Sequence, residues 1–509
     1  MVNGYILEGF DERGEPIWHH GMLVRDGRVA YLGDNPEEIS APGSKVVDLR
    51  GRVVLPGFID AHLHVLEVGA STLMLDLRGV ESIAELKRLV SEKAGELGVG
   101  EWILGRGWDQ ERFIEKRLPT RWDLDEVSPL NPVLLVRVCG HMAVANTLAL
   151  RLAGIDESTP DPPGGEISRS CGRITGVLKE TAIELVRRVI PEVCGSTRRI
   201  VERALGLLAS SGITTVHGVS VGREELEALI ELSKRGKLPV RVRVYVRPEL
   251  LNSARRGEVN DCVSVMGIKI FLDGSFGART AALREPYSDD PSTSGFLLYS
   301  DEELASTLRR ACRAGLQVAV HAIGDLAVEQ LLRVLNRESI PGRVIRVEHA
   351  SLSPPDLMAE MKHLGINVVV QPHFVISDWW IVERLGSRRC RWVYAFKSLL
   401  KSNLLVAFSS DAPVEPYNPW EGVYAAVTRG KYEGRPLASL TLSEALSVNE
   451  AIRCYTEIPA RLTGDALGRL SKGFPADFII VGLNPFKIGD RDLNRIRILS
   501  TYVNGIRVH

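Results

Sequence analysis

Neither sign of charge dominates this sequence. Lys and Arg together number 63, Asp and Glu 64, so the formal net charge at pH 7 is −1, and no long run of like charge occurs. Proteins that bind nucleic acids or anionic membranes usually carry a clear excess or a patch of positive charge. We therefore expect neither nucleic acid nor membrane as a partner.

The sequence also lacks long hydrophobic runs. No stretch approaches the length needed to cross a bilayer, and Met1 to Pro16 contain no basic segment followed by an apolar one. The sequence therefore predicts a cytoplasmic protein.

Cysteine and glutamine are scarce. The seven cysteines form no CxxC pair, which argues against a zinc ribbon or a redox pair and favours buried small side chains. Glutamine occurs only at positions 110, 317, 330 and 371, and arginine outnumbers lysine. Scarcity of this thermolabile amide fits a heat-adapted source, in which an intracellular disulfide is not excluded.

What is present is an ordinary globular composition with a regular alternation of patterns. The chain has 509 residues, 45% of them hydrophobic, which is enough for two or three domains. From about residue 205, β-branched runs alternate with helical patterns such as 223–235, 301–314, 326–336 and 353–364. The predicted strands are 53–64, 212–219, 239–246, 266–273, 316–321, 344–349, 366–371 and 404–411. Eight strands with intervening helices predict an α/β fold, a (β/α)₈ TIM barrel.

Two regions do not fit the alternation. Residues 66–204 are too long for one crossover and predict an inserted domain. The ends carry further short strands, at 21–34, 45–53, 476–482 and 498–509, with Asp26-Gly27 and Asn504-Gly505 as turns. We expect a small β-sandwich domain from 1–55 and 465–509, and a barrel from 56–65 and 205–464.

A pair of histidines ends the first predicted barrel strand. His62 and His64 are two positions apart, so in an extended chain both side chains lie on one face and reach the same ion. An HxH pair alone is weak evidence. The carboxyl end of a buried barrel strand, however, is where such barrels keep their chemistry.

The later strands end in a matching set of polar residues. Each has an ordinary structural explanation on its own: a core histidine, a helix N-cap, an ion-paired lysine. Together, four imidazoles and a carboxylate supply ligands for one or two divalent ions, zinc by default, with Mn, Fe, Co or Ni as alternatives. The set is His62, His64, Lys269, His321, His349 and Asp411.

Lys269 needs a separate explanation because an ammonium group beside two cations would be repelled. A buried lysine readily loses its proton, and the neutral amine can take up CO₂ to become a carbamate. A carboxylated lysine would bridge two metals. Without carboxylation, a mononuclear site is favoured.

The residues at these positions resemble the amidohydrolase superfamily of metal-dependent hydrolases, and more narrowly the branch of N-substituted formamide deformylase-like proteins. The similarity covers nearly the whole chain. The matching segments are PGFIDAHLH at 56–64, GWDQERF at 107–113, LPTRWDLDEVSP at 118–129, GHMAVANTLAL at 140–150, IKIFLDGSFGARTAAL at 268–283, HAIGDLAVE at 321–329, RVEHA at 346–350 and SSDAPVEP at 409–416.

The resemblance implies a role for each residue of the set. His62, His64 and Asp411 would hold one metal, His321 and His349 the other, with Lys269 as the bridge. The cofactors would be two zinc ions, acting on a small-molecule substrate. Metal-activated water would attack a carbon–nitrogen bond of an amide or cyclic amide. Asp411 would take the water's proton and pass it to the leaving nitrogen.

Substrate specificity should lie in the loops and the insertion. His141 is a candidate to bind the substrate carbonyl, or else a structural histidine. Trp108, Asp109 and Trp379 are candidates to line the pocket, although core packing explains the aromatics as well. Glu180 reads as a helix-surface acid, with an extra site carboxylate as the alternative.

Two other functions stay open. One is a mononuclear deaminase acting on an aminated heterocycle, although the glutamate usual after the strand-five histidine is absent here. The other is a retired hydrolase that serves as a scaffold, which the full ligand set disfavours. The substrate and the oligomeric state, a homodimer included, are not determined by the sequence.

Overall fold

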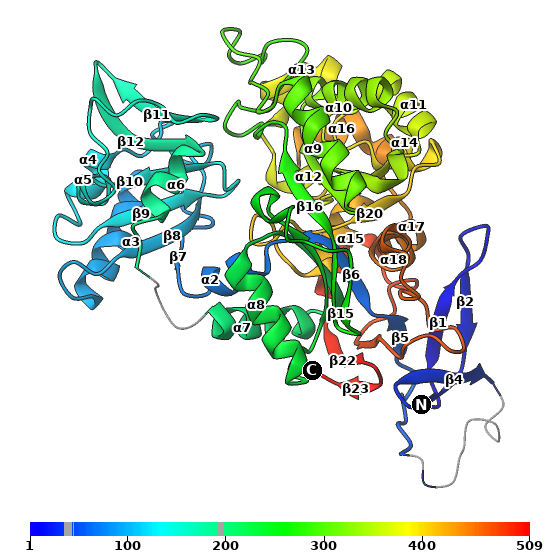
Figure 1. Cartoon of the computed structure of the whole chain (residues 1–509). Coiled ribbons are helices and arrows are strands. Elements are labelled where there is room, and N and C mark those ends of the chain that lie inside the picture. The colour runs from blue at the N-terminus through cyan, green and yellow to red at the C-terminus, as the bar shows by residue number, and fades with distance from the viewer. Residues whose placement is uncertain (35–42, 44, 192–196) are drawn as a thin grey trace. The chain divides into compact units, whose positions relative to one another are not determined.

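The computed structural model describes residues 1–34, 43, 45–191 and 197–509, and Cys194 lies outside this set. The chain divides into two compact units. Unit 1 comprises Met1–Leu66, Thr197–Asp273 and Ala282–His509. Unit 2 comprises Glu67–Ser196 and the short segment Gly274–Ala281. Figure 1 follows the elements of both units in chain order.

Unit 1 contains the predicted parallel barrel. Neighbouring strands pair in parallel in the order β20-β19-β18-β17-β16-β14-β13-β6, and β15 (Gly257–Asn260) pairs antiparallel with β16. The barrel strands are β6 (Phe58–Leu63), β13 (Ile213–Val221), β14 (Arg241–Val246), β16 (Val263–Phe271), β17 (Gln317–Ala322), β18 (Ile345–His349), β19 (Asn367–Val370) and β20 (Val406–Phe408).

The first and last strands meet just beyond the end of β20. The backbone N–H of Asp411 donates to the carbonyl of His62 (2.8 Å), and that of His64 donates to the carbonyl of Ala412 (2.9 Å). The strands are nearly continuous apolar runs because both faces are buried, as is usual for parallel sheets covered by helices. The eight-stranded barrel prediction is confirmed.

Helices connect the barrel strands at the predicted places. Side-chain caps start several of them. Ser300, for example, forms a capping box with Glu303 at the start of α9. The helices of unit 1 are α7 (Thr197–Ser210), α8 (Arg223–Lys234), α9 (Asp301–Arg313), α10 (Asp325–Glu338), α11 (Pro355–Leu364), α12 (Phe374–Ser377), α13 (Ile381–Cys390), α14 (Phe396–Lys401), α15 (Pro419–Thr428), α16 (Pro436–Thr441), α17 (Val448–Tyr455) and α18 (Glu457–Thr463). Short 3₁₀ turns are η1 (Pro248–Leu250), η2 (Gly342–Val344), η3 (Leu442–Glu444) and η4 (Asp490–Arg495).

The two ends of the chain share a second sheet of unit 1, with order β2-β1-β5-β21-β22-β23, and β3 and β4 form a separate hairpin through the Asp26-Gly27 turn. Their bounds are β1 (Tyr5–Phe10), β2 (Pro16–His19), β3 (Gly21–Arg25), β4 (Arg28–Gly33), β5 (Val53–Pro56), β21 (Phe478–Val481), β22 (Ile498–Val503) and β23 (Ile506–Arg507). The strand predicted at 45–53 is wrong: residues 45–52 form no strand and make only an isolated bridge, from Asp48 to Val2, and β5 begins at Val53.

The single strand predicted over 53–64 is two strands in different sheets. The chain leaves the terminal sheet at Gly57, whose N–H donates to the carbonyl of Asp477, and enters the barrel at Phe58. A Cβ at Gly57 would lie 2.2 Å from the side chain of Thr214, so the close approach at this transition requires glycine. The bend foreseen at Pro56-Gly57 is therefore a change of sheet.

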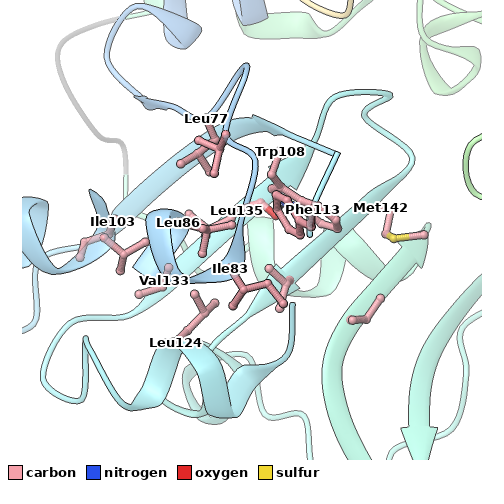
Figure 2. Close-up of a cluster of buried hydrophobic side chains, with 14 of the residues drawn as sticks. Leu77, Ile83, Leu86, Ile103, Trp108, Phe113, Leu124, Val133, Leu135 and Met142 are labelled. Atoms are coloured by element: carbon pink, nitrogen blue, oxygen red, sulfur yellow. The ribbon is translucent and has the colours of Figure 1, made fainter. Parts of the chain in front are cut away.

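Unit 2 is built around a six-stranded sheet of order β11-β12-β10-β9-β8-β7. Its strands are β7 (Leu75–Asp76), β8 (Ile103–Trp108), β9 (Val133–Arg137), β10 (Met142–Ala145), β11 (Gly165–Ser170) and β12 (Arg173–Glu180), and its helices are α3 (Ile83–Glu96), α4 (Arg121–Asp125), α5 (Thr147–Leu152) and α6 (Ala182–Arg187). Helix α2 (Val65–Ser71) contains the point in the chain at which unit 1 ends, at Leu66, and unit 2 begins, at Glu67. Figure 2 shows the core, in which Leu86, Trp108 and Leu135 are fully buried.

The segment 274–281, which follows barrel strand β16, contributes Ala278 to this core. In the described part of the chain, six cysteines are free and no helix is long and apolar enough to cross a membrane.

Candidate metal centre

The six predicted ligands all lie at or near the carboxyl ends of barrel strands. His62 is in β6 with His64 just after it, Lys269 is in β16, His321 in β17, His349 is the last residue of β18, and Asp411 follows β20. His62, Lys269, His321 and His349 are at most 3% exposed. The barrel thus gathers buried polar groups at one end.

Three of these residues form the tightest group. One ligand atom each from His62, His349 and Asp411 lie within 4.8 Å of one another. The Nε2 atoms of His62 and His64 are each 3.3 Å from Oδ1 of Asp411. This spacing suits a single ion that takes two imidazole nitrogens and a carboxylate oxygen.

Left-handed backbone conformations orient two members of the group. The φ angle is 76° at His349 and 55° at Asp411, a region that side chains with a Cβ rarely adopt. Such strain is kept where the surroundings over-determine it, often at functional sites. The left-handed conformation at His349 also interrupts the pattern in which successive side chains of β18 point to opposite faces of the sheet.

Outer hydrogen bonds fix the two imidazole rings. Nδ1 of His62 contacts the Glu348 carboxylate, and Nδ1 of His349 is 2.7 Å from Oε1 of Gln371. The Gln371 amide is itself oriented, because its Nε2 donates to Oγ of Ser409 (2.9 Å), whose hydroxyl donates to the carbonyl of Val370 (3.2 Å). A carboxylate and an oriented amide oxygen only accept, so both rings carry their proton on Nδ1.

The donor set therefore fits a cation. With Nδ1 protonated, a neutral imidazole has its lone pair on Nε2, and for His62 that atom faces a carboxylate oxygen of Asp411 only 3.3 Å away. Two acceptors at this distance repel each other unless a positive ion lies between them. A histidine backed at Nδ1 by a carboxylate or carbonyl is also the usual form of a metal-ligating histidine.

Electrostatics keep this set in its binding form. Burial opposes ionisation of Glu348, but the charge of Arg346 holds the pKa of Glu348 well below its ordinary range. Burial lowers the pKa of His349 to about 3, so its imidazole is neutral at physiological pH. The group then offers two lone pairs and one negative charge.

Lys269 lies beside this group as a buried amine. Its side chain is 1% exposed, and among the described residues its Nζ has no hydrogen-bond partner. Its Nζ lies 4.7 Å from the centroid of the Phe271 ring. Burial lowers the pKa of Lys269 to about 8, despite the nearby carboxylates of Glu348 and Asp411, which act in the opposite direction. An orphaned, easily deprotonated amine suits a group that is modified or coordinated.

Which ion each residue would hold stays a prediction. His349, which was paired with His321, is the residue that joins His62 and Asp411 in the tightest group. His321 lies next to it, with ring centroids 4.4 Å apart, and its Nε2 is 3.5 Å from Oδ1 of Asp273. His64 is near Asp411 and its side chain is 19% exposed.

Four supporting residues escaped the sequence reasoning: Asp60, Arg346, Glu348 and Gln371. Asp60 accepts backbone N–H groups of His62 and Ser410, and burial raises its pKa to about 7. One signal could have found most of these residues: a charged or amide side chain within a strand that is otherwise continuously apolar must be paired or functional.

Two of the predicted pocket residues, Trp108 and Asp109, make buried contacts within unit 2. Trp108 is fully buried in the core of unit 2, and its Nε1 donates to the carbonyl of Leu135 (2.8 Å). Asp109 accepts a 2.6 Å hydrogen bond from the buried guanidinium of Arg137. Trp108 thus has the core-packing role that the sequence offered for the aromatics, and a role of Asp109 at a substrate pocket stays a prediction.

Glu180 is not a helix-surface acid. It ends strand β12 with a φ of 51°, and its side chain is 8% exposed. Its carboxylate is 2.8 Å from Nδ1 of His141 and accepts a 2.7 Å hydrogen bond from Thr280. His141 is therefore oriented within unit 2, whereas Trp379 lies half-buried between α12 and α13. Their roles toward a substrate stay predictions.

Comparison with known proteins decides the family. A model of the amidohydrolase family matches residues 45–509. The chain belongs to this family. The match includes all six predicted ligands, so the geometry above describes an amidohydrolase-family barrel.

Relatives of this amidohydrolase-family chain cover nearly all of it. The putative amidohydrolase YtcJ of Bacillus subtilis is 34% identical over 96% of this chain and 98% of its own. The N-substituted formamide deformylase of Arthrobacter pascens is 28% identical over 95% of this chain and 94% of its own. An uncharacterised metal-dependent hydrolase from Pyrococcus horikoshii, of known structure, is 39% identical with a TM-score of 0.80, covering 96% of this chain and 98% of that one.

Proposed function

We propose that this amidohydrolase-family chain is a metal-dependent hydrolase that cleaves a non-peptide carbon–nitrogen bond, in an amide or cyclic amide. The observation that carries the proposal is the meeting of the His62 Nε2 lone pair with the Asp411 carboxylate at 3.3 Å, with His349 completing the group. The described relatives support it, since one is named a deformylase of substituted formamides and another a metal-dependent hydrolase.

The residues have distinct tasks in this proposal. His62, His349 and Asp411 hold the cation, with His64 and His321 as further donors beside them. A bound divalent cation, zinc by default, supplies Lewis acidity and lowers the pKa of water at this position. Asp411 takes up the proton of the attacking water and delivers it to the leaving nitrogen.

The one-ion and two-ion forms of the site differ in whether Lys269 is carboxylated. In the two-ion form the neutral amine of Lys269 would add to CO₂ with loss of one proton, and the resulting carbamate would supply oxygen ligands for the ions. The orphaned Nζ and the lowered pKa of Lys269 support this form. In the one-ion form, which the compact group of three residues favours, the chain would be suited to deaminate an aminated heterocycle instead.

One experiment tests the proposal and separates the alternatives. Metal analysis of the purified protein is combined with a screen of N-formyl and N-acyl amines, cyclic amides and aminated heterocycles. We expect bound divalent ions and turnover of an amide, both lost in His62→Ala and kept in the control His363→Ala, whose imidazole is exposed at the end of α11. Equal turnover by His62→Ala would overturn the site, and protein with neither ions nor turnover would support the scaffold alternative.

The domain architecture is a further part of this proposal. The terminal sheet and the β3–β4 hairpin enclose a common apolar cluster that includes Ile6, Met22, Val29, Val54 and Phe478, which supports a β-sandwich of residues 1–55 and 465–509. The barrel then comprises 56–65 and 205–464 and the inserted domain 66–204, except that the whole of α7 (Thr197–Ser210) belongs to unit 1 and so lies on the barrel side of the boundary.

A further inference from the structure

A buried charged network lies behind the metal ligands in the barrel interior. Arg346 and Glu348 are two positions apart in β18, so their side chains share the face that points into the barrel, and they are 2% and 0% exposed. Neither belongs to the group of potential ligands. Such residues affect a bound ion only through the ligands that they contact.

Arg346 uses its guanidinium to fix several strands around one carboxylate. Its Nε contacts Oε1 of Glu348, and its second terminal nitrogen lies 3.0 Å from Oε2, which makes the pair bidentate. The same nitrogen also donates to the carbonyl of Ala61 in β6, next to His62. The guanidinium carbon lies 4.5 Å from the ring centroid of Tyr245 in β14.

The remaining contact of Arg346 is with a neutral group. Its other terminal nitrogen is 2.9 Å from Nδ1 of His217 in β13. Burial, and then the charge of Arg346, lower the pKa of His217 well below its ordinary value, so this imidazole accepts the hydrogen bond and carries no charge. Glu348 is thus the carboxylate to which Arg346 is bound.

We propose that Arg346, by holding Glu348 in a fixed bidentate pair, sets the tautomer of His62 and thereby determines how strongly the site retains a divalent cation. Both oxygens of Glu348 face the Arg346 guanidinium, so this carboxylate only accepts hydrogen bonds. Nδ1 of His62 then carries the proton, and Nε2 keeps a lone pair that can bind the cation. This inference rests on the proposed metal-dependent function. Arg346 and Glu348 are positioning residues, which touch neither the cation nor the substrate.

A comparison with His349 shows what the charge adds. Nδ1 of His349 makes a similar outer hydrogen bond, but it donates to the oxygen of a neutral amide, that of Gln371. An amide can turn its NH₂ group toward the ring and reverse the tautomer, and Ser409 prevents this at Gln371. At Glu348 no such rotation is possible.

The test is a competition titration of Zn²⁺ against a chromogenic chelator, for the wild type, Glu348→Gln, Arg346→Met and the double variant. Loss of an outer-shell partner typically weakens metal binding about 10- to 100-fold, and we expect this in each single variant. Because Arg346 acts through Glu348, the double variant should bind no more than about threefold more weakly than Glu348→Gln. The matched control is Asp477→Asn, which perturbs a different buried Arg–carboxylate pair, that of Arg241 and Asp477. This variant should leave the affinity for Zn²⁺ unchanged.

Two further measurements guard against loss of folding. If Glu348→Gln unfolds, the apolar pair Arg346→Met with Glu348→Met fills the same space without charge, and it should fold yet bind Zn²⁺ weakly. In ¹⁵N-histidine spectra of the metal-free wild type, the ring of His62, assigned by its loss in His62→Gln, should show a protonated Nδ1, and Glu348→Gln should change that pattern.

The outcomes separate the two proposals. Wild-type binding that is equally tight in Glu348→Gln, or affinity losses that add in the double variant, would overturn the positioning role while leaving the metal site intact. A wild-type protein that binds no divalent cation would overturn the proposed function, and the positioning role with it.

Discussion

Both ends of the barrel bury charged residues, but at the amino end these residues have hydrogen-bond partners and at the carboxyl end some of them do not. At the amino end, Arg241 of β14 donates to Asp477 (2.8 Å) and to the carbonyl of Asp261 (2.8 Å), and it also contacts Asn504. At the carboxyl end, the Nε2 lone pair of His62 faces Asp411, and Nζ of Lys269 lacks a partner among the described residues. Matched donors and acceptors stabilise a fold, whereas mismatched ones at a strand-end cluster indicate a ligand that completes them.

The largest expected effect is at the mismatched end. Asp411→Asn removes a cation ligand and the proton acceptor together, so kcat/KM on a substrate found in the screen should fall by more than about 10³-fold. The thermal stability of the metal-free protein should change little. An equal activity loss in Asp477→Asn would remove the distinction between the two ends.

A substitution at the amino end of the barrel should lower the stability of the fold and leave metal binding unchanged. Asp477→Ala leaves Arg241 buried without its carboxylate, which should cost about 3–5 kcal/mol in the free energy of unfolding, measured by urea denaturation. The divalent ion content of the folded protein should not change. A loss of ions without a loss of stability would contradict the role assigned to this pair.

The pH dependence of stability should sharpen the contrast. Burial lowers the pKa of Lys269 from 10.5 to about 8, so between these pH values the unfolded chain binds the additional proton. The free energy of unfolding of the metal-free protein should therefore rise as the pH increases from 8 to 10.5, by up to about 3 kcal/mol. Below pH 8 the destabilisation is complete and constant. Lys269→Met should lack this rise, and the same slope in both proteins would refute the assignment.

The smallest effect is expected from His141 in unit 2. Nδ1 of His141 is 2.8 Å from the Glu180 carboxylate, which also accepts a hydrogen bond from Thr280. Like Arg241, His141 therefore has a hydrogen-bond partner within the fold. If it binds the substrate carbonyl, His141→Ala should raise KM about tenfold while the ion content stays unchanged. A loss of ions would make it a ligand, and unchanged kinetics would make it structural.

Much of the barrel and the common location of its candidate ligands could be predicted from the sequence, because both depend on local signals. Continuous β-branched runs identify strands buried on both faces, and parallel strands bring their carboxyl ends to one edge. His62, Lys269, His321 and Asp411 each lie at or near the end of such a run, so their common location follows from topology alone.

The remaining features depend on contacts between distant residues. The change of sheet at Gly57 requires the close approach of Thr214, and the pairing of His62 with Glu348 joins residues 286 positions apart. His349 lies close to His62 and Asp411 with a left-handed backbone, which no residue type at that position predicts. The sequence left two roles open for Trp108 because an aromatic in a core and one in a pocket share the same apolar context.

The central claim is tested most directly by counting divalent ions per chain in the purified wild type and in a variant that combines His62→Ala with His349→Ala. The account predicts one or two tightly held ions in the wild type and none in the variant. An ion count that is unchanged in the variant, or a wild type that takes up no divalent ion when metal is supplied, would contradict it.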